Sequence, residues 1–216
     1  MKFTLIYDGP LPAGDNKRAV YAQKVRNYLH PQLRDLWDNH VLMRQLLHEA
    51  VVNKQWMGDL ALDMRGPALP DYRGNPPPLR ESQMSLITTI DKGSAGTFLP
   101  IVRNNLYLAC EIDILFLRHE EPMHLFSQGG DIDNRIKCFF DGLKIPDADQ
   151  GNGIEDPRAQ PLCVVLEDDK LISDISIRSG RLLGKENKDR YDVRIQADIT
   201  IKVLRLFHAN MALVGG

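Results

Sequence analysis

The chain has 216 residues, of which 43% are hydrophobic and 26% are charged, the composition of a globular protein with a substantial core. Its 27 basic residues face 29 acidic ones, and the formal net charge of −2 excludes a broadly basic protein that binds nucleic acid over its whole surface. No apolar run approaches the ~20 residues that a membrane-spanning helix requires, so no membrane partner is expected.

The N-terminal segment and the cysteines both indicate a cytoplasmic protein. The chain becomes polar too soon after Met1 for a signal peptide. The cysteines are odd in number and fall in different predicted elements, at Cys110, Cys138 and Cys163. This pattern favours buried thiols in a reducing compartment over a disulfide framework.

The N-terminal part of the chain begins with a strand and continues with helices. Apolar residues alternate over Phe3–Tyr7, which predicts a strand that turns at Gly9-Pro10. A helical period begins at about Asn16, and Pro31 suits the first turn of a second helix that continues to Val51. Residues 64–82 are rich in proline and are predicted to form a loop.

The middle of the chain alternates strand and helix. A strand is predicted over Leu106–Leu117, whose alternate residues are apolar. A helix of about three turns follows from Asn134, because apolar residues recur there at helical spacing. Residues 144–162 are rich in Asp, Gly and Pro and are predicted to be a loop, followed by a short apolar segment, Cys163–Leu166.

Two β segments are predicted near the C-terminus. The first contains Ile172, Ile175 and Ile177, and the second, Tyr191–Val203, has the clearest alternation in the chain. The charged turn at Gly184–Asp189 between them predicts a hairpin, and the tail from Met211 is expected to be loose.

These elements predict an α+β fold over residues 1–216, with a small mixed β-sheet packed against helices. Residues 98–205 form the core that carries the polar motifs. Residues 17–82 are interpreted as an added N-terminal helical region and a proline-rich loop that elaborate this core.

The most informative stretch is Asp131-Ile132-Asp133-Asn134-Arg135-Ile136-Lys137, followed by an acidic pair at Asp168-Asp169. In an extended segment Asp131 and Asp133 point the same way and can reach one divalent metal ion. Lys137 lies one helical turn after Asp133, where its ammonium group can approach a metal-held phosphate, and Asp141 can pair with Lys137. The alternative is an ordinary helix cap with solvated charges.

The order Asp131-x-Asp133-Asn134-x-x-Lys137-x-x-x-Asp141-x-Leu143, then Asp168-Asp169-x-x-Ile172, resembles the signature of the RusA-type Holliday-junction resolvases. The resemblance implies a homodimeric, magnesium-dependent crossover junction endodeoxyribonuclease of DNA recombination and repair, with manganese as a substitute ion. It implies that Asp131, Asp133 and Asp169 are metal ligands and that Lys137 completes the catalytic set. Asn134, Asp141 and Asp168 are implied to support those ligands.

The same resemblance leads to a surface that binds branched DNA. The candidate contacts are basic residues beside the motifs and beside the predicted hairpin, namely Arg135, Arg178, Arg181, Lys185 and Lys188. The sequence departs from the family pattern in its longer 144–162 segment, whose added acids, Asp147 among them, would repel DNA if they faced the site.

Two other functions are compatible with parts of the pattern. One is a catalytically inactive DNA-binding or assembly protein that has kept the fold, although the intact acids and Lys137 disfavour it. The other is a metal-dependent nucleotide-sugar transferase, since a DxD sequence can hold a metal bound to a diphosphate. No nucleotide-binding βαβ pattern precedes the motif, which disfavours the transferase.

Overall fold

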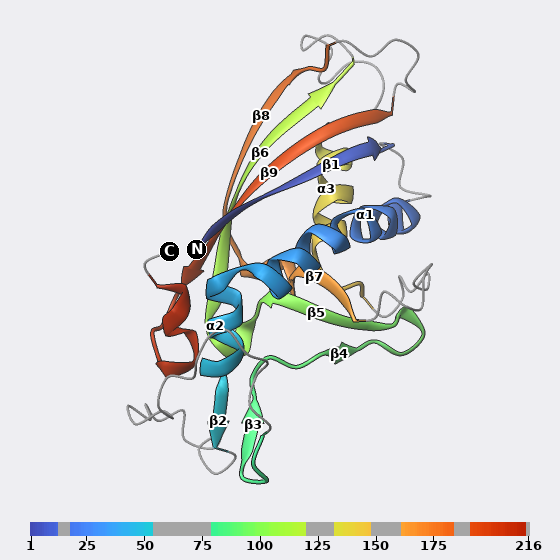
Figure 1. Ribbon diagram of the computed structural model, residues 1–216. Helices are drawn as coiled ribbons and strands as arrows, with labels where there is room; N and C mark the ends of the chain where they lie inside the picture. The colour runs from blue at the N-terminus through green and yellow to red at the C-terminus, as the bar shows by residue number, and fades with distance from the viewer. Residues whose placement is uncertain (13–17, 54–78, 120–131, 148–160, 184–190, 215–216) are drawn as a thin grey trace.

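A four-stranded mixed sheet is the main sheet of the protein and has helices on one of its faces (Figure 1). The computed structural model describes residues 1–12, 18–53, 79–119, 132–147, 161–183 and 191–214. The sheet has the order β1-β9-β6-β8, in which β6 and β8 are parallel and the other neighbours antiparallel. Its strands are β1 (Lys2–Pro10), β6 (Leu108–Arg118), β8 (Ile172–Arg181) and β9 (Asp192–Val203).

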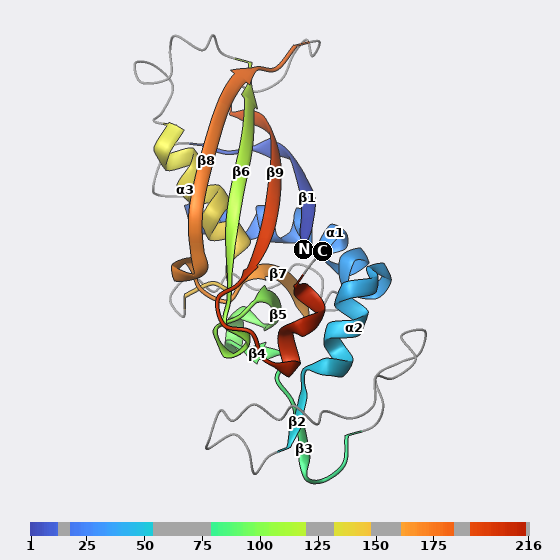
Figure 2. The ribbon, with the colours of Figure 1, turned by 90° about the vertical axis from the view of Figure 1, so that its left-hand side faces the viewer.

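Alternation along the central strands gives this sheet one apolar and one polar face. In β9 the residues Val193, Ile195, Ala197, Ile199 and Ile201 are buried. The opposite face, seen in Figure 2 with α3 behind it, carries charges in pairs such as Lys202–Glu111 (3.0 Å) and Arg194–Asp8 (2.5 Å). In sheets of this kind, one face packs on the core and the other is exposed to water.

Helices α1 (Arg18–Asn39) and α3 (Ile132–Leu143) cover the apolar face. From α1, Val25, Leu29, Leu33 and Trp37 enter the same core cluster as the sheet residues. The two helices approach closely at Gly142, where an added Cβ would lie 2.4 Å from Val25 Cγ1. Helix α1 is thus part of the main core.

Smaller elements complete the fold below the main sheet. A second sheet contains β4 (Ile90–Asp91), β5 (Thr97–Val102) and β7 (Leu162–Leu166), with β5 and β7 parallel. Helix α2 (Val41–Glu49) precedes β2 (Val51–Asn53), which pairs with β3 (Gln83–Ser85). Short 3-10 helices are η3 (Gly93–Ala95), η4 (Asn104–Leu106), η8 (Asp169–Leu171) and η9 (His208–Leu213).

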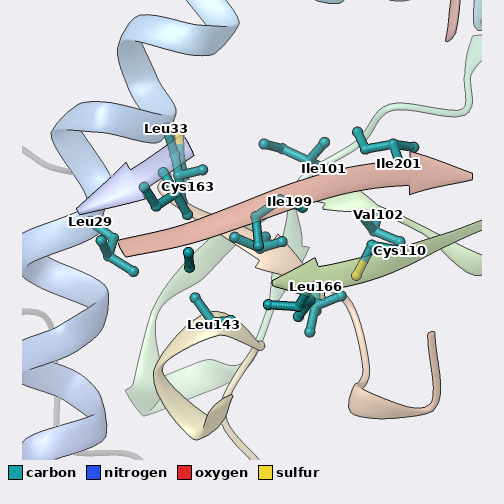
Figure 3. Packing of buried hydrophobic residues seen from close by; sticks show 14 of the residues in the cluster. Leu29, Leu33, Ile101, Val102, Cys110, Leu143, Cys163, Leu166, Ile199 and Ile201 are labelled. Atoms are coloured by element: carbon teal, nitrogen blue, oxygen red, sulfur yellow. The ribbon is translucent and has the colours of Figure 1, made fainter. Parts of the chain in front are cut away.

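The core forms where α1, α3, β7 and the main sheet meet. Figure 3 shows Leu29 and Leu33 of α1 near Cys163 of β7, with Leu143 and Ile199 in the same cluster. All three cysteines are free and buried. Burial raises the pKa of the Cys163 thiol to about 11, so this thiol stays protonated at neutral pH.

The predicted α+β class, a mixed sheet packed against helices, is confirmed. The predicted helix break at Pro31 is wrong, because α1 continues through Pro31 and ends at Asn39. A proline inside a helix removes one hydrogen bond. The buried residues Leu29, Leu33 and Trp37, on both sides of the proline, hold the helix against the core in spite of that loss.

The predicted hairpin between the last two strands is also wrong. Strand β6 lies between β8 and β9, since Ile112 pairs with Ile175 on one side and with Ile199 on the other. The strongly apolar face of β9 favours an interior position, whereas Ile175 and Ile177 of β8 remain 44% exposed at the sheet edge.

The C-terminal residues are more ordered than the sequence predicts. The 3-10 helix η9 packs on α2, and Ala212 N donates to the buried carboxylate of Glu49 at 2.8 Å. Among the described residues, no helix is long and apolar enough to cross a membrane.

Candidate active site

Helix α3 carries the polar side chains of the first motif (residues 131–143) from Asp133 onward. The helix begins at Ile132, so Asp133 and Asn134 lie in its first turn and the extended geometry expected for residues 131–133 does not apply to Asp133. Asp131 lies outside the described residues. Lys137 Nζ donates to Asp133 Oδ2 at 2.5 Å across one helical turn.

The spacing predicts that Asp141 pairs with Lys137. In the structure Asp141 pairs instead with Arg18, at the start of α1. Asp141 is only 8% exposed, because α1 lies against this part of α3. The close approach at Gly142 brings Arg18 within reach of the carboxylate. Lys137 and Asp133 lie nearer the N-terminus of α3, and their side chains are about half exposed.

The two aspartates of the second motif (residues 168–172) differ in their contacts. Asp168 caps the short helix η8, accepting a hydrogen bond from Lys170 N at 2.9 Å. This backbone hydrogen bond lowers the pKa of Asp168. Asp169 instead accepts from Lys144 Nζ at 3.2 Å. Asp168 therefore shapes the turn, and Asp169 presents its carboxylate at the site.

Lys144 links the second motif to the end of α3. Its side chain is 11% exposed and donates to Asp147 and Asp169, both at 3.2 Å. Burial alone would lower the pKa of Lys144, but the two carboxylates outweigh it and the pKa is raised. Asp147, one of the acids expected to repel DNA, thus shares the Lys144 ammonium group with Asp169.

A cavity of about 470 Å³ lies between the start of α1, α3 and β8. Lys137 from the first motif and Asp169 from the second line it together with Arg18. The remaining lining residues are Phe140, Asp141, Ile172, Ser173, Asp174 and Ile175. Parts of the chain that are far apart in sequence therefore meet around one concave surface, which is a usual location for a binding site.

The residues present fit magnesium in part. Among the described residues, no three His, Cys, Asp or Glu side chains gather closely enough to hold a metal ion. The expected ligand set also includes Asp131, which is outside them. Magnesium typically uses one or two protein carboxylates together with waters and substrate phosphates. Asp133 and Asp169 are carboxylates of the two motifs whose side chains are 56% and 54% exposed, and in this structure they pair with Lys137 and Lys144. Of the two, Asp169 lines the cavity.

The candidate DNA contacts are distributed unevenly. Arg135 is fully buried, and its guanidinium carbon lies 5.9 Å from the centre of the Tyr191 ring, so it does not present a solvent-facing contact. Arg181 of β8 lies opposite Arg118 of β6 in the strand register, on the apolar face of the sheet. Arg178 pairs with Leu115 and lies on the opposite face. Lys185 and Lys188 are outside the described residues.

Two cations of the site were not predicted from the motifs. Arg18 begins α1, outside both acidic motifs, and its pairing with Asp141 places it at the cavity. Lys144 follows the helix directly, but no spacing signals that its side chain turns towards Asp169. Both contacts depend on tertiary packing.

Compared with protein-family models, curated proteins and solved structures, the chain matches none of them.

Proposed function

We propose that the protein is a magnesium-dependent, structure-selective DNA endonuclease that hydrolyses phosphodiester bonds at four-way or related branched junctions. The observation that carries this proposal is the cavity shared by Lys137 and Asp169, with Asp133 hydrogen-bonded to Lys137. Phosphodiester hydrolysis requires carboxylates for a metal ion and a cation near the reacting phosphate. The motifs that resemble those of the RusA-type resolvases supply both at this cavity.

Each side chain has a distinct part in the proposed reaction. Asp133 and Asp169, with Asp131, would hold magnesium, which supplies charge stabilisation at the phosphate and a bound water of lowered pKa. Lys137 reaches the cavity while Asp133 orients its ammonium group, which would offset negative charge developing on the phosphate oxygens. Asp168 keeps the η8 turn closed, so that Asp169 is presented at the cavity.

The charge distribution supports selection by DNA structure. The outer face of the main sheet carries ion pairs such as Arg194–Asp8 and Lys202–Glu111, and the whole chain is slightly acidic. Long-range attraction to any duplex is therefore weak, and affinity has to come from local contacts at the cavity. We further propose a homodimer, because symmetrical nicking of a four-way junction requires two active sites.

The test is cleavage of a labelled four-way junction and of a matching linear duplex in magnesium. Wild type should cut the junction selectively, and Asp133→Asn should reduce cutting by about 100-fold or more. Asp113→Asn is the matched control, because Asp113 is an exposed acid of β6 on the face opposite the core. Its activity should equal that of wild type.

Other outcomes separate the alternatives. Junction binding without cutting by wild type would indicate a non-catalytic binding protein. Neither cutting nor binding would overturn the proposal. Equal loss of activity in Asp113→Asn and Asp133→Asn would show that the effect does not arise at this cavity.

A further inference from the structure

Arg18 is the cavity residue whose role the acidic motifs do not explain. It is the first residue of α1 and lines the cavity together with Lys137. Its Nε donates to Asp141 Oδ2, and within the described part of the chain this is the hydrogen bond that its guanidinium makes. A guanidinium has five N–H donors. Within that part of the chain, the donors of its two terminal nitrogens make no hydrogen bond and can meet a ligand.

Asp141 fixes the direction of this guanidinium. Its carboxylate is largely buried under α1, so a paired arginine is held more firmly than one on an open surface. Arg34 provides the contrast within the same helix. Its Nε donates to Asp38 Oδ2 at 2.8 Å, but both side chains are about half exposed and lie away from the cavity. The Arg34–Asp38 pair is thus an exposed surface pair, whereas the Arg18–Asp141 pair forms part of the cavity wall.

The remaining lining residues indicate the kind of ligand. Phe140 of α3 and Ile172 and Ile175 of β8 provide an apolar wall, which suits a sugar ring. Two of the three acids that line the cavity are held by cations, Asp141 by Arg18 and Asp169 by Lys144. The third, Asp174, lines the cavity from β8. Fixed cations beside an apolar wall fit a phosphodiester backbone.

We infer that Arg18 and Lys137 form a paired phosphate site, in which Arg18 binds the phosphate next to the one that Lys137 contacts. Lys137 and Asp141, which holds Arg18, are one helical turn apart, about 6 Å along the axis of α3. The inference rests on the proposed function and deepens it, because it names a residue that would hold the nucleic-acid backbone without belonging to either acidic motif.

The first experiment measures pyrophosphate binding by calorimetry in EDTA. Arg18→Met should weaken binding about 10-fold or more, the effect of losing a charge-assisted hydrogen-bonding group. Arg18→Lys should recover part of the affinity, because lysine keeps the positive charge but lacks the planar, bidentate donors of the guanidinium group. Arg34→Met is the matched control and should bind pyrophosphate as wild type does.

The second experiment measures junction binding in EDTA as a function of salt concentration. Removing one phosphate contact should lower the slope of log affinity against log salt by about 0.9 in Arg18→Met and leave it unchanged in Arg34→Met. If Arg18→Met loses its fold, Arg18→Met combined with Asp141→Asn removes both partners and avoids an unpaired buried carboxylate. A melting curve establishes which variant to use.

The inference is overturned if Arg18→Met, or the double variant, behaves like Arg34→Met in both experiments. Junction cutting that Asp133→Asn abolishes and Arg18→Met leaves intact would refute the inference and keep the proposed function. Pyrophosphate binding that depends on Arg18, in a protein that neither binds nor cuts junctions, would keep the anion site and refute the proposed function.

Discussion

Replacing Gly142 with alanine tests how closely α1 must lie against α3 for the cavity to form. The new Cβ would lie 2.4 Å from Val25 Cγ1 and 2.5 Å from Val25 Cβ, and the second of these atoms cannot rotate away. Inserting a methyl group into such a contact costs about 3 kcal/mol at the upper end of the overpacking range. Alanine gains about 1 kcal/mol over glycine inside a helix.

The difference predicts that Gly142→Ala is less stable by about 2 kcal/mol, or about 4–8 °C in melting temperature for a chain of this length. Urea and thermal denaturation measure it. Gly180→Ala is the control, since its Cβ would meet only the end of the Leu117 side chain at 3.0 Å. The control should change stability by less than about 0.5 kcal/mol. A Gly142→Ala protein as stable as wild type would refute a fixed contact between the helices.

Two further variants test the charged groups of the site by denaturation at several pH values. Lys144→Met should lower the urea midpoint at pH 7. Burial lowers the pKa of Lys144, but its hydrogen bonds to Asp147 and Asp169 raise it more, so its stabilising effect is complete below about pH 10.4 and is lost as the pH rises through the raised pKa. A difference that persists unchanged at higher pH would contradict this origin. Asp168→Ala should cost about 1 kcal/mol at pH 7, the usual effect of losing a helix cap. The backbone hydrogen bond from Lys170 lowers the pKa of Asp168, so this difference should shrink as the pH falls below about 3.9, and a constant difference would argue against the cap.

The sequence predicted those elements whose residues alternate or recur within one segment. The strand that became β9 and the helix that became α3 were found because burial of one face leaves a local period in the chain. The alternation of β1 was equally clear, although the strand runs on through Gly9-Pro10 to its pairing with Asp192.

The errors concern contacts between segments that are distant in sequence. A charged turn between two strands suggested a hairpin, but β8 pairs with β6, and no residue of the turn carries that information. Spacing of four along a helix made Asp141 a partner for Lys137, yet the packing of α1 supplied Arg18 instead. Within the candidate site, the spacing put Asp133 and Lys137 together correctly. The approach of Lys144 to Asp169 was beyond such reasoning.

The pairing of β1 with β9 has a consequence for the order in which the protein can fold during synthesis. Lys2 pairs with Thr200, and Leu108 in β6 pairs with Val203. The strand that joins β1 to the rest of the sheet is therefore made after β6 and β8, and β1 has no partner in this sheet until β9 has left the ribosome. Contacts between such distant segments slow folding and leave unpaired strands exposed meanwhile. We expect nascent chains that stop before Asp192 to depend on chaperones, because β1 then has no strand to pair with in this sheet.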